Sequence, residues 1–231
     1  MPRSIAALIR HGDYRQLPDT PSAHQPFALT EQGMAQAVRA VELLQQHSRQ
    51  LNCPIDPAIA SSTLLRAWQT ATIIGENLPD MEAGVQQHEE LAERCVGAAA
   101  NLSMGQITDI LRHDPRYREP PADWKSNSHY RLPFPGAESL MQAGKRVAKV
   151  LAREMRAMRQ QNRGDRIKVI VGHGAAFRHA AHHLGILKYD QIARLSMYHC
   201  RPVLLELHDD DSWSHIGGDW KIRQQSENHI D

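Results

Sequence analysis

Short apolar runs and longer apolar stripes at helical spacing alternate along this chain of 231 residues. The runs at 4–9 and 167–171 have the length and composition of buried strands. Val203–Leu207 is a third such run, and residues 52–60 and 85–91 each have room for a short strand. The pattern therefore predicts five strands spread over the whole chain.

Helical stripes lie between these runs. Thr30 is a suitable N-cap for a helix that reaches about His47, and Ser61 or Ser62 for the next helix. The apolar stripe expected on the first helix is Met34, Val38, Val41 and Leu44, and that on the second is Leu64, Ala67, Ala71, Ile74 and Leu78. A long amphipathic helix is expected over 138–161 and a shorter one from about Ala176 to Leu184.

This alternation of strands and helices predicts an α/β three-layer sandwich, with a mainly parallel central sheet and helices on both faces. The length fits a single domain spanning 1–231. Between 101 and 137 the periodicity fails and five prolines occur. We expect residues 101–135 to be an insertion within the domain, either a lid over the sheet edge or a merely solvated loop.

Composition narrows the class of protein. The 27 Lys and Arg residues nearly balance the 26 Asp and Glu residues, which argues against a general nucleic-acid-binding protein. No apolar segment is long enough for a membrane span, and the N-terminus does not resemble a signal peptide. Cys53, Cys95 and Cys200 show no metal-binding spacing, so we expect reduced thiols and a cytoplasmic protein. The oligomeric state, a homodimer included, stays open.

Two histidines follow apolar runs directly, in Arg10-His11-Gly12 and in Gly172-His173-Gly174. The carboxyl ends of neighbouring parallel strands meet at one edge of a sheet, where ligands bind. A helix begins after His173, and its free N–H groups favour an anion near Gly174. Arg66, in the first turn of the second helix, can reach the same edge.

Such a cluster of arginines and histidines suits a phosphoryl group. The arginine fork matches phosphate oxygens, and an imidazole can attack phosphorus and hold the phosphoryl group covalently. The leaving alkoxide then needs a proton from a nearby acid.

Six motifs in order resemble the histidine phosphatase (phosphoglycerate-mutase-like) superfamily over about residues 5–180. They are Leu8-Ile-Arg-His-Gly12, Leu29-Thr30-x-x-Gly33, Ser62-x-x-x-Arg66-Ala-x-Gln-Thr70-Ala, Leu91-x-Glu93-x-x-x-Gly97, Pro135-Gly-x-Glu138-Ser and Val171-Gly-His-Gly174.

The resemblance implies a role for each matched residue. His11 is the expected phosphoryl acceptor, and Glu93 the expected proton donor, with Glu89 and Glu90 as rivals. The residues expected to hold the phosphate are Arg10, Arg66, His173 and Gly174, with His173 also stabilising the transition state. Members of this family need no metal and no organic cofactor.

Two departures from the family pattern favour hydrolysis over mutase chemistry. Asp13-Tyr14 stands where many mutases have Thr and Asn, and Glu93-Arg94-Cys95-Val96-Gly97 lacks the tyrosine that mutases carry. We therefore expect a phosphomonoesterase acting on a small phosphorylated metabolite or a phosphoprotein. A phosphoglycerate mutase and a non-catalytic binding protein on the same fold are the alternatives.

Residues that select the substrate are harder to predict. The candidates are Arg15, Arg94, Arg116, Arg118 and His129. Arg116, Arg118 and His129 belong to a basic cluster in the insertion. This cluster could recognise an anionic substrate or could equally be a solvated charged loop. His179, His182 and His183 have a spacing that permits a metal site. Because no carboxylate or cysteine accompanies them, ordinary helix residues are favoured.

Overall fold

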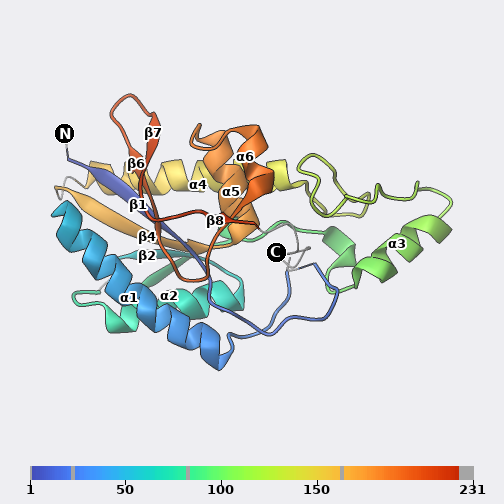
Figure 1. Cartoon of the computed structure of the whole chain (residues 1–231), viewed down its shortest axis with the longest axis horizontal. Helices are drawn as coiled ribbons and strands as arrows, with labels where there is room; N and C mark the ends of the chain where they lie inside the picture. The colour runs from blue at the N-terminus through green and yellow to red at the C-terminus, as the bar shows by residue number, and fades with distance from the viewer. Residues whose placement is uncertain (1, 22–23, 82–83, 162–163, 224–231) are drawn as a thin grey trace.

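A six-stranded sheet forms the centre of the computed structural model, which describes residues 2–21, 24–81, 84–161 and 164–223 (Figure 1). Its strand order is β3-β2-β4-β1-β6-β7. The strands are β1 (Ser4–Arg10), β2 (Ile59–Ser62), β3 (Val85–His88), β4 (Arg166–Gly172), β6 (Val203–Leu207) and β7 (Trp213–Gly217). The first four are parallel to one another, β6 runs antiparallel to β1, and β7 runs antiparallel to β6. A separate antiparallel pair joins β5 (Leu195–Ser196) to β8 (Lys221–Ile222).

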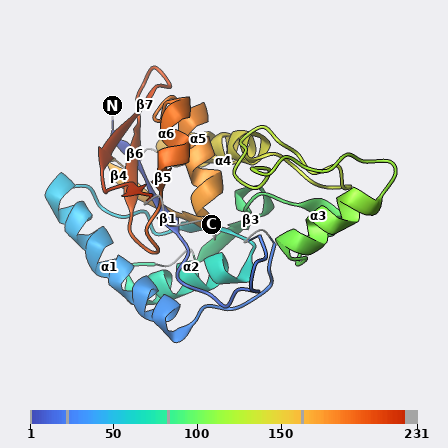
Figure 2. The same ribbon diagram turned by 45° about the vertical axis from the view of Figure 1, so that its right-hand side comes forward.

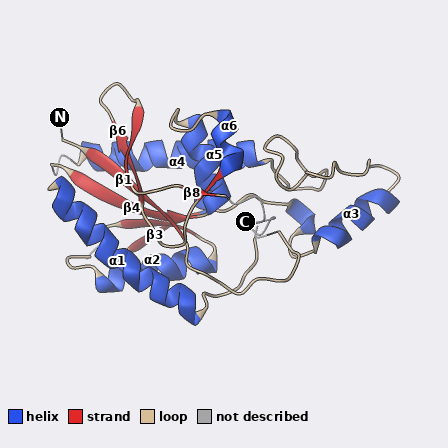
Figure 3. Cartoon of the chain, in the orientation of Figure 1, coloured by secondary structure: helices blue, strands red, loops and turns tan. Residues whose placement is uncertain are grey.

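Helices cover both faces of the sheet, which confirms the predicted three-layer sandwich (Figures 2 and 3). On one face α1 (Glu31–Leu51) and α2 (Leu65–Asn77) share a core with Ile5, Ala7 and Ile9 of β1. On the other face α4 (Leu140–Gln160) and α5 (Gly174–His183) share a second core with Ala6 and Leu8. The alternating residues of β1 thus contribute to two separate cores, as the period of a strand requires. None of the helices in the described ranges is both long and apolar enough to cross a membrane.

The buried face of α1 differs from the expected stripe. Val41 and Leu44 are buried, but Met34 and Val38 are 44% and 46% exposed. Small residues, Ala37 and Ala40 among them, lie against the sheet instead. The sequence pattern favoured the larger apolar side chains, whereas close helix–sheet packing buried the alanines.

The start of α2 also differs from the prediction. Ser61 and Ser62 complete β2, and the N-cap of α2 is Leu64, with no side-chain hydrogen bond. The hydroxyl of Ser62 accepts a hydrogen bond from the N–H of Leu64 at 3.2 Å. A serine expected to cap a helix is therefore the last residue of a strand, at the carboxyl edge of the parallel strands.

The segment 101–135 is more ordered than its prolines suggested. It contains α3 (Met104–His113), which begins with a capping box between Ser103 and Gln106. The helix packs into a third apolar cluster made of Val96, Ala99, Ile107, Leu111, Trp124, Leu132 and Ala137. Figures 1 and 2 show that the part of the chain around α3 extends away from the sheet. The capping box and the four-residue spacing of Ile107 and Leu111 were the signals for a helix that the sequence analysis missed.

The remaining elements are short. They are the 3₁₀ helices η1 (Glu89–Leu91) and η2 (Gly97–Ala99), and α6 (Tyr189–Arg194), which follows α5.

Candidate active site

The central feature of the site is the pairing of β1 with β4. Arg10 lies opposite Gly172 in this parallel ladder, so both strands end at the same level. The next residue of one strand is His11 and that of the other is His173, and their ring centroids are 5.1 Å apart. The structure therefore brings together the two histidines that the sequence placed at strand ends.

Hydrogen bonding fixes the tautomer of His11. Its Nδ1 lies 2.7 Å from the carbonyl oxygen of Gly12, which can only accept, so Nδ1 carries the proton. In the neutral imidazole Nε2 then holds the lone pair. The Nε–H of Arg66 donates to this atom at 3.2 Å.

Arg66 is fully buried beside His11. One end of its guanidinium donates to the carbonyl oxygen of Gln25 at 3.0 Å. Its guanidinium carbon lies 4.5 Å from the ring centroid of Tyr14, whose edge also contacts the His11 ring. Tyr14, one of the residues that departs from the family pattern, thus packs against both the imidazole and the arginine.

Burial and positive charge keep both histidines neutral. Desolvation is the main cause that lowers the pKa of His11 and of His173 well below the usual value, and the charge of Arg66 adds to it. Burial likewise lowers the pKa of Arg66. At neutral pH His11 is accordingly an unprotonated imidazole, the form that can act as a nucleophile.

His173 caps the N-terminus of α5 through its backbone and is held by its Nε2, 2.9 Å from the Ser62 hydroxyl. Its buried Nδ1 has no hydrogen-bond partner in the described part of the chain. Next to it, a Cβ on Gly174 would lie 3.2 Å from Cδ of Arg10, so the glycine lets this arginine lie close to the helix start. An unpartnered ring nitrogen, an arginine and a helix N-terminus together suit the oxygens of an anion.

Glu93 is the carboxylate at this helix start. One of its oxygens accepts from the N–H of Ala175 in the first turn of α5 at 3.2 Å, and the other from the N–H of Arg94 at 2.8 Å. Glu93 is buried, whereas Glu89 is exposed and Glu90 pairs with Arg153 at 3.2 Å. Of the three rival carboxylates, Glu93 is the one that faces the histidines' end of the sheet.

An arginine on α4 holds the segment that carries Glu93. The Arg146 guanidinium donates to the carbonyl oxygens of Glu90 and Ala92 and pairs with the carboxylate of Glu138 at 2.5 Å. Glu138 in turn accepts from the N–H of Cys95. The residues on both sides of Glu93 are thereby tied to α4.

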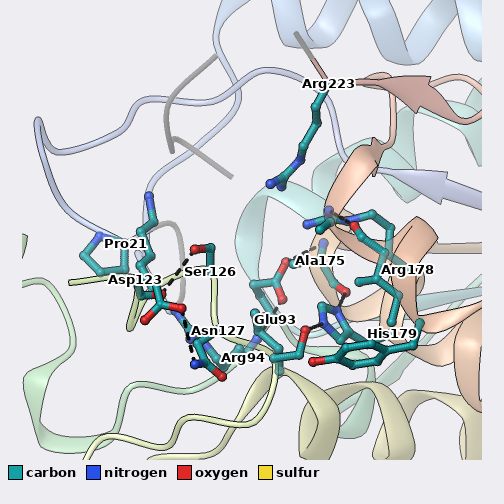
Figure 4. A pocket seen from close by; sticks show the side chains of 16 residues that line it. Pro21, Glu93, Arg94, Asp123, Ser126, Asn127, Ala175, Arg178, His179 and Arg223 are labelled. Carbon is teal, nitrogen blue, oxygen red and sulfur yellow. Dashed lines mark hydrogen bonds between the residues drawn. The ribbon is translucent and has the colours of Figure 1, made fainter. Parts of the chain in front are cut away.

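A cavity of about 450 Å³ opens beside Glu93 and Ala175 (Figure 4). Its walls come from the 93–94 segment, from α5 and α6, and from the insertion. The lining residues are Pro21, Glu93, Arg94, Asp123, Lys125, Ser126, Asn127, Ser128, Leu140, Ala175, Arg178, His179, Tyr189, Ile192, Ala193 and Arg223. His11 and His173 do not line this cavity, and Glu93, which bonds to the N–H of Ala175, is the candidate site residue that it shares with the start of α5.

The expected specificity residues are distributed unevenly around the cavity. Arg94 lines it and lies over the Trp124 ring, and burial lowers its pKa. His129 is exposed and stacks on Tyr189, a lining residue. His129 does not line the cavity itself, nor do Arg15, Arg116 and Arg118; these three arginines are exposed, and Arg116 pairs with Asp114 at 2.7 Å.

The three histidines of α5 make separate contacts. His179 bonds to the carbonyl oxygen of Ala175 and to the hydroxyl of Ser128, His182 to the carbonyl oxygen of Leu187, and His183 to that of Met141. Within the described ranges no group of three His, Cys, Asp or Glu side chains is placed to hold a metal ion. His179 instead connects the insertion to the wall of the cavity.

Two further histidines at the site were not identified from the sequence. His24 lies with Nε2 3.0 Å from the carbonyl oxygen of Glu93, and His199 with Nδ1 2.6 Å from that of His11. Both come from loops, where no periodicity marks position. The total of 14 histidines was the only hint of additional imidazoles.

The fold and this arrangement are those of an α/β enzyme with two histidines at the carboxyl edge of its sheet. The model of the histidine phosphatase superfamily (branch 1) matches residues 6–216, and the chain belongs to this superfamily.

The curated proteins that are similar in sequence to this chain include phosphoglycerate mutases. The chain is 25% identical over 210 residues to the 2,3-bisphosphoglycerate-dependent phosphoglycerate mutase of Parvibaculum lavamentivorans, covering 89% of this chain and 91% of the relative.

Solved structures with this fold include phosphatases. A mycobacterial glucosyl-3-phosphoglycerate phosphatase superposes with a TM-score of 0.68 at 23% identity, covering 95% of this chain and 98% of the other. A putative alpha-ribazole-5'-P phosphatase from Escherichia coli superposes with a TM-score of 0.65 at 21% identity, covering 92% and 94%. At these identities the likeness establishes the fold alone.

Proposed function

We propose that this protein is a phosphomonoesterase that works through a phosphohistidine on His11. The observation that carries the proposal is the state of this imidazole: neutral, with Nδ1–H bonded to Gly12 and the Nε2 lone pair directed at the Arg66 guanidinium. A phosphate bound to Arg66 would bring its phosphorus to this lone pair.

The proposed reaction has two steps. Nε2 of His11 attacks phosphorus as the P–O bond to the leaving alcohol breaks, and Glu93 gives its proton to the departing oxygen. Water then attacks the phosphorus of phosphohistidine, giving its proton to the Glu93 carboxylate as the P–N bond breaks, which releases phosphate and restores His11. Arg10, Arg66, His173 and the N–H groups at Gly174 stabilise the charge on the phosphoryl oxygens in both steps.

The decisive experiment traps the intermediate. The wild-type protein is mixed with a panel of phosphorylated metabolites and phosphopeptides, then quenched in base and tested for acid-labile, base-stable phosphate on the protein. We expect the label on His11 and its absence in His11→Ala, which also loses turnover. Full phosphatase activity of His11→Ala on every substrate would exclude the mechanism.

Mutase chemistry is the second candidate because the curated relatives are phosphoglycerate mutases. It would use the same site but retain the product for rebinding. Phosphatases among the structural neighbours and the absence of a tyrosine at Val96 favour hydrolysis. Adding 3-phosphoglycerate with catalytic 2,3-bisphosphoglycerate separates the two: isomerisation much faster than phosphate release would establish a mutase.

A further inference from the structure

His199 lies directly beside the proposed nucleophile, in the loop between β5 and β6. Its ring centroid is 5.6 Å from that of His11. Its Nδ1 is 2.6 Å from the main-chain carbonyl oxygen of His11. A carbonyl oxygen only accepts, so Nδ1 of His199 is the donor and carries a proton.

The same peptide unit is held from its other side. The N–H of Gly12, which belongs to the His11–Gly12 peptide, donates to the hydroxyl of Thr70 on α2 at 3.0 Å. One imidazole therefore holds the oxygen of this peptide while a hydroxyl holds its N–H. The N–H of His11 itself donates to the carbonyl oxygen of Gly172 at 3.0 Å, which fixes the preceding peptide as well.

The orientation of this peptide determines where the nucleophilic nitrogen points. Nδ1–H of His11 bonds to the carbonyl oxygen of Gly12, immediately after the clamped peptide. A rotation of the His11–Gly12 peptide would displace that oxygen and turn the ring, moving Nε2 away from Arg66. Misplacing a reacting atom by about 1 Å can cost about a hundredfold in rate.

The loop that carries His199 is itself attached to the end of β1. The N–H of Cys200 donates to the carbonyl oxygen of Arg10 at 2.9 Å, and the Arg10 guanidinium donates to that of Met197 at 3.0 Å. Cys200 is buried and has a φ of 55°, a left-handed conformation that side-chain-bearing residues seldom adopt. This backbone geometry makes the loop turn where His199 meets His11.

We infer that His199 is a positioning residue for the phosphohistidine chemistry, acting through its Nδ1–H bond to the backbone of His11. The inference rests on the proposed function, because it assigns His11 as the nucleophile. In this role the His199 imidazole lies beside the proposed nucleophile and orients its backbone, and it takes no part in proton transfer.

Replacing His199 with Asn or with Gln distinguishes a positioning role from an effect of side-chain size or polarity. The Asn amide nitrogen lies at nearly the same distance along the side chain as Nδ1 of histidine, and the Gln amide nitrogen corresponds to Nε2. His199→Asn therefore keeps a donor for the His11 carbonyl, whereas His199→Gln moves it out of place. We expect His199→Asn to retain kcat within about threefold and His199→Gln to lose about tenfold or more, with KM nearly unchanged in both.

The rate of His11 phosphorylation in a single turnover is the direct readout, with thermal melting to confirm that both variants are folded. His113→Ala is the matched control, because it removes another Nδ1–carbonyl bond on α3, away from the site. Equal rates for the Asn and Gln variants, whether both normal or both impaired, would overturn the role of His199. So would a loss confined to KM. Normal turnover in His11→Ala would instead overturn the proposed function.

Discussion

Arg66 donates a hydrogen bond to the nitrogen of His11 that is proposed to attack phosphorus, across 3.2 Å, from a fully buried position. The guanidinium lies at the point where a phosphoryl group would be transferred. Its charge also disfavours protonation of the imidazole, which keeps the lone pair available.

Replacing this arginine tests the relationship. Arg66→Lys keeps a cation but loses the planar fork, and we expect kcat/KM for phosphate monoesters to fall about 10²–10³-fold, as when a preorganised donor is removed from a transition state. Steady-state kinetics measure the loss. Arg39→Met, an exposed arginine on α1, is the control and is expected to behave as wild type. A loss of less than threefold in Arg66→Lys would show that the guanidinium does not contact the transferred group.

The assignment of Glu93 as the acid predicts dependence on the leaving group. Glu93→Gln should reduce turnover of alkyl phosphates about 10²–10⁴-fold, the usual range for general acid catalysis. Phosphorylation of His11 by p-nitrophenyl phosphate should fall far less, because p-nitrophenolate leaves without a proton. Glu89→Gln, an exposed neighbour, should change neither rate. Equal losses on both substrates would argue that Glu93 only supports the start of α5.

Three buried histidines make stability sensitive to acid. Burial lowers the pKa of His11 and His173 well below the usual value and that of His179 to about 3. Above pH 6.5 folded and unfolded chains are both neutral at these positions. Below it the unfolded chain takes up protons that the folded chain refuses, so the free energy of unfolding falls as pH falls.

Well below pH 6.5 each such histidine adds at most about 1.4 kcal/mol per pH unit to the slope, or at most about 4 kcal/mol per unit for the three together, and it adds less near pH 6.5, where the unfolded chain is only half protonated. Urea unfolding at pH 7.0, 6.0 and 5.5 measures this slope. His179→Asn should reduce it by about one third if the protein stays folded. A free energy of unfolding that is constant from pH 7.0 to 5.5 would contradict the neutral, buried state of these rings.

The close contact between α4 and α5 predicts that alanine substitutions at two glycines, Gly144 and Gly75, change the free energy of unfolding in opposite directions. A Cβ added at Gly144 would lie 2.3 Å from Cβ of His179, so Gly144→Ala forces the helices apart and should cost about 1–3 kcal/mol. At Gly75 of α2 the nearest atom would be 3.5 Å away, and Gly75→Ala should stabilise by up to about 1 kcal/mol through helix propensity. Thermal or urea unfolding compares the two. Similar effects at both positions would show that α4 and α5 can separate without cost.

The sequence predicted those parts of the site that regular structure positions. His11 and His173 follow strands with a clear apolar pattern, and Arg66 lies in a helix whose start could be located within a few residues. Parallel pairing then brings these side chains together without further information. Glu93 followed from the family resemblance, because its own segment, between η1 and η2, has no periodicity.

Residues delivered by loops could not be predicted in this way. His199 reaches His11 because Cys200 turns the backbone, and nothing in its neighbours' polarity indicates that contact. Met34 and Val38 show a different limit, since hydrophobicity alone does not say which edge of an apolar stripe faces the sheet. α3 was missed because the surrounding prolines masked a short but well-capped helix.

The apolar cluster beneath the insertion shares no residue with the two cores of the sheet. The segment that forms one wall of the cavity thus packs on its own apolar cluster, whereas the strands that end at His11 and His173 pack in the two cores of the sheet. We expect substitutions within the insertion to change the shape of this cavity without disturbing the packing under β1 and β4. If the proposed function holds, a change of substrate therefore requires substitutions in this one segment only, and the residues proposed for the chemistry keep their packing.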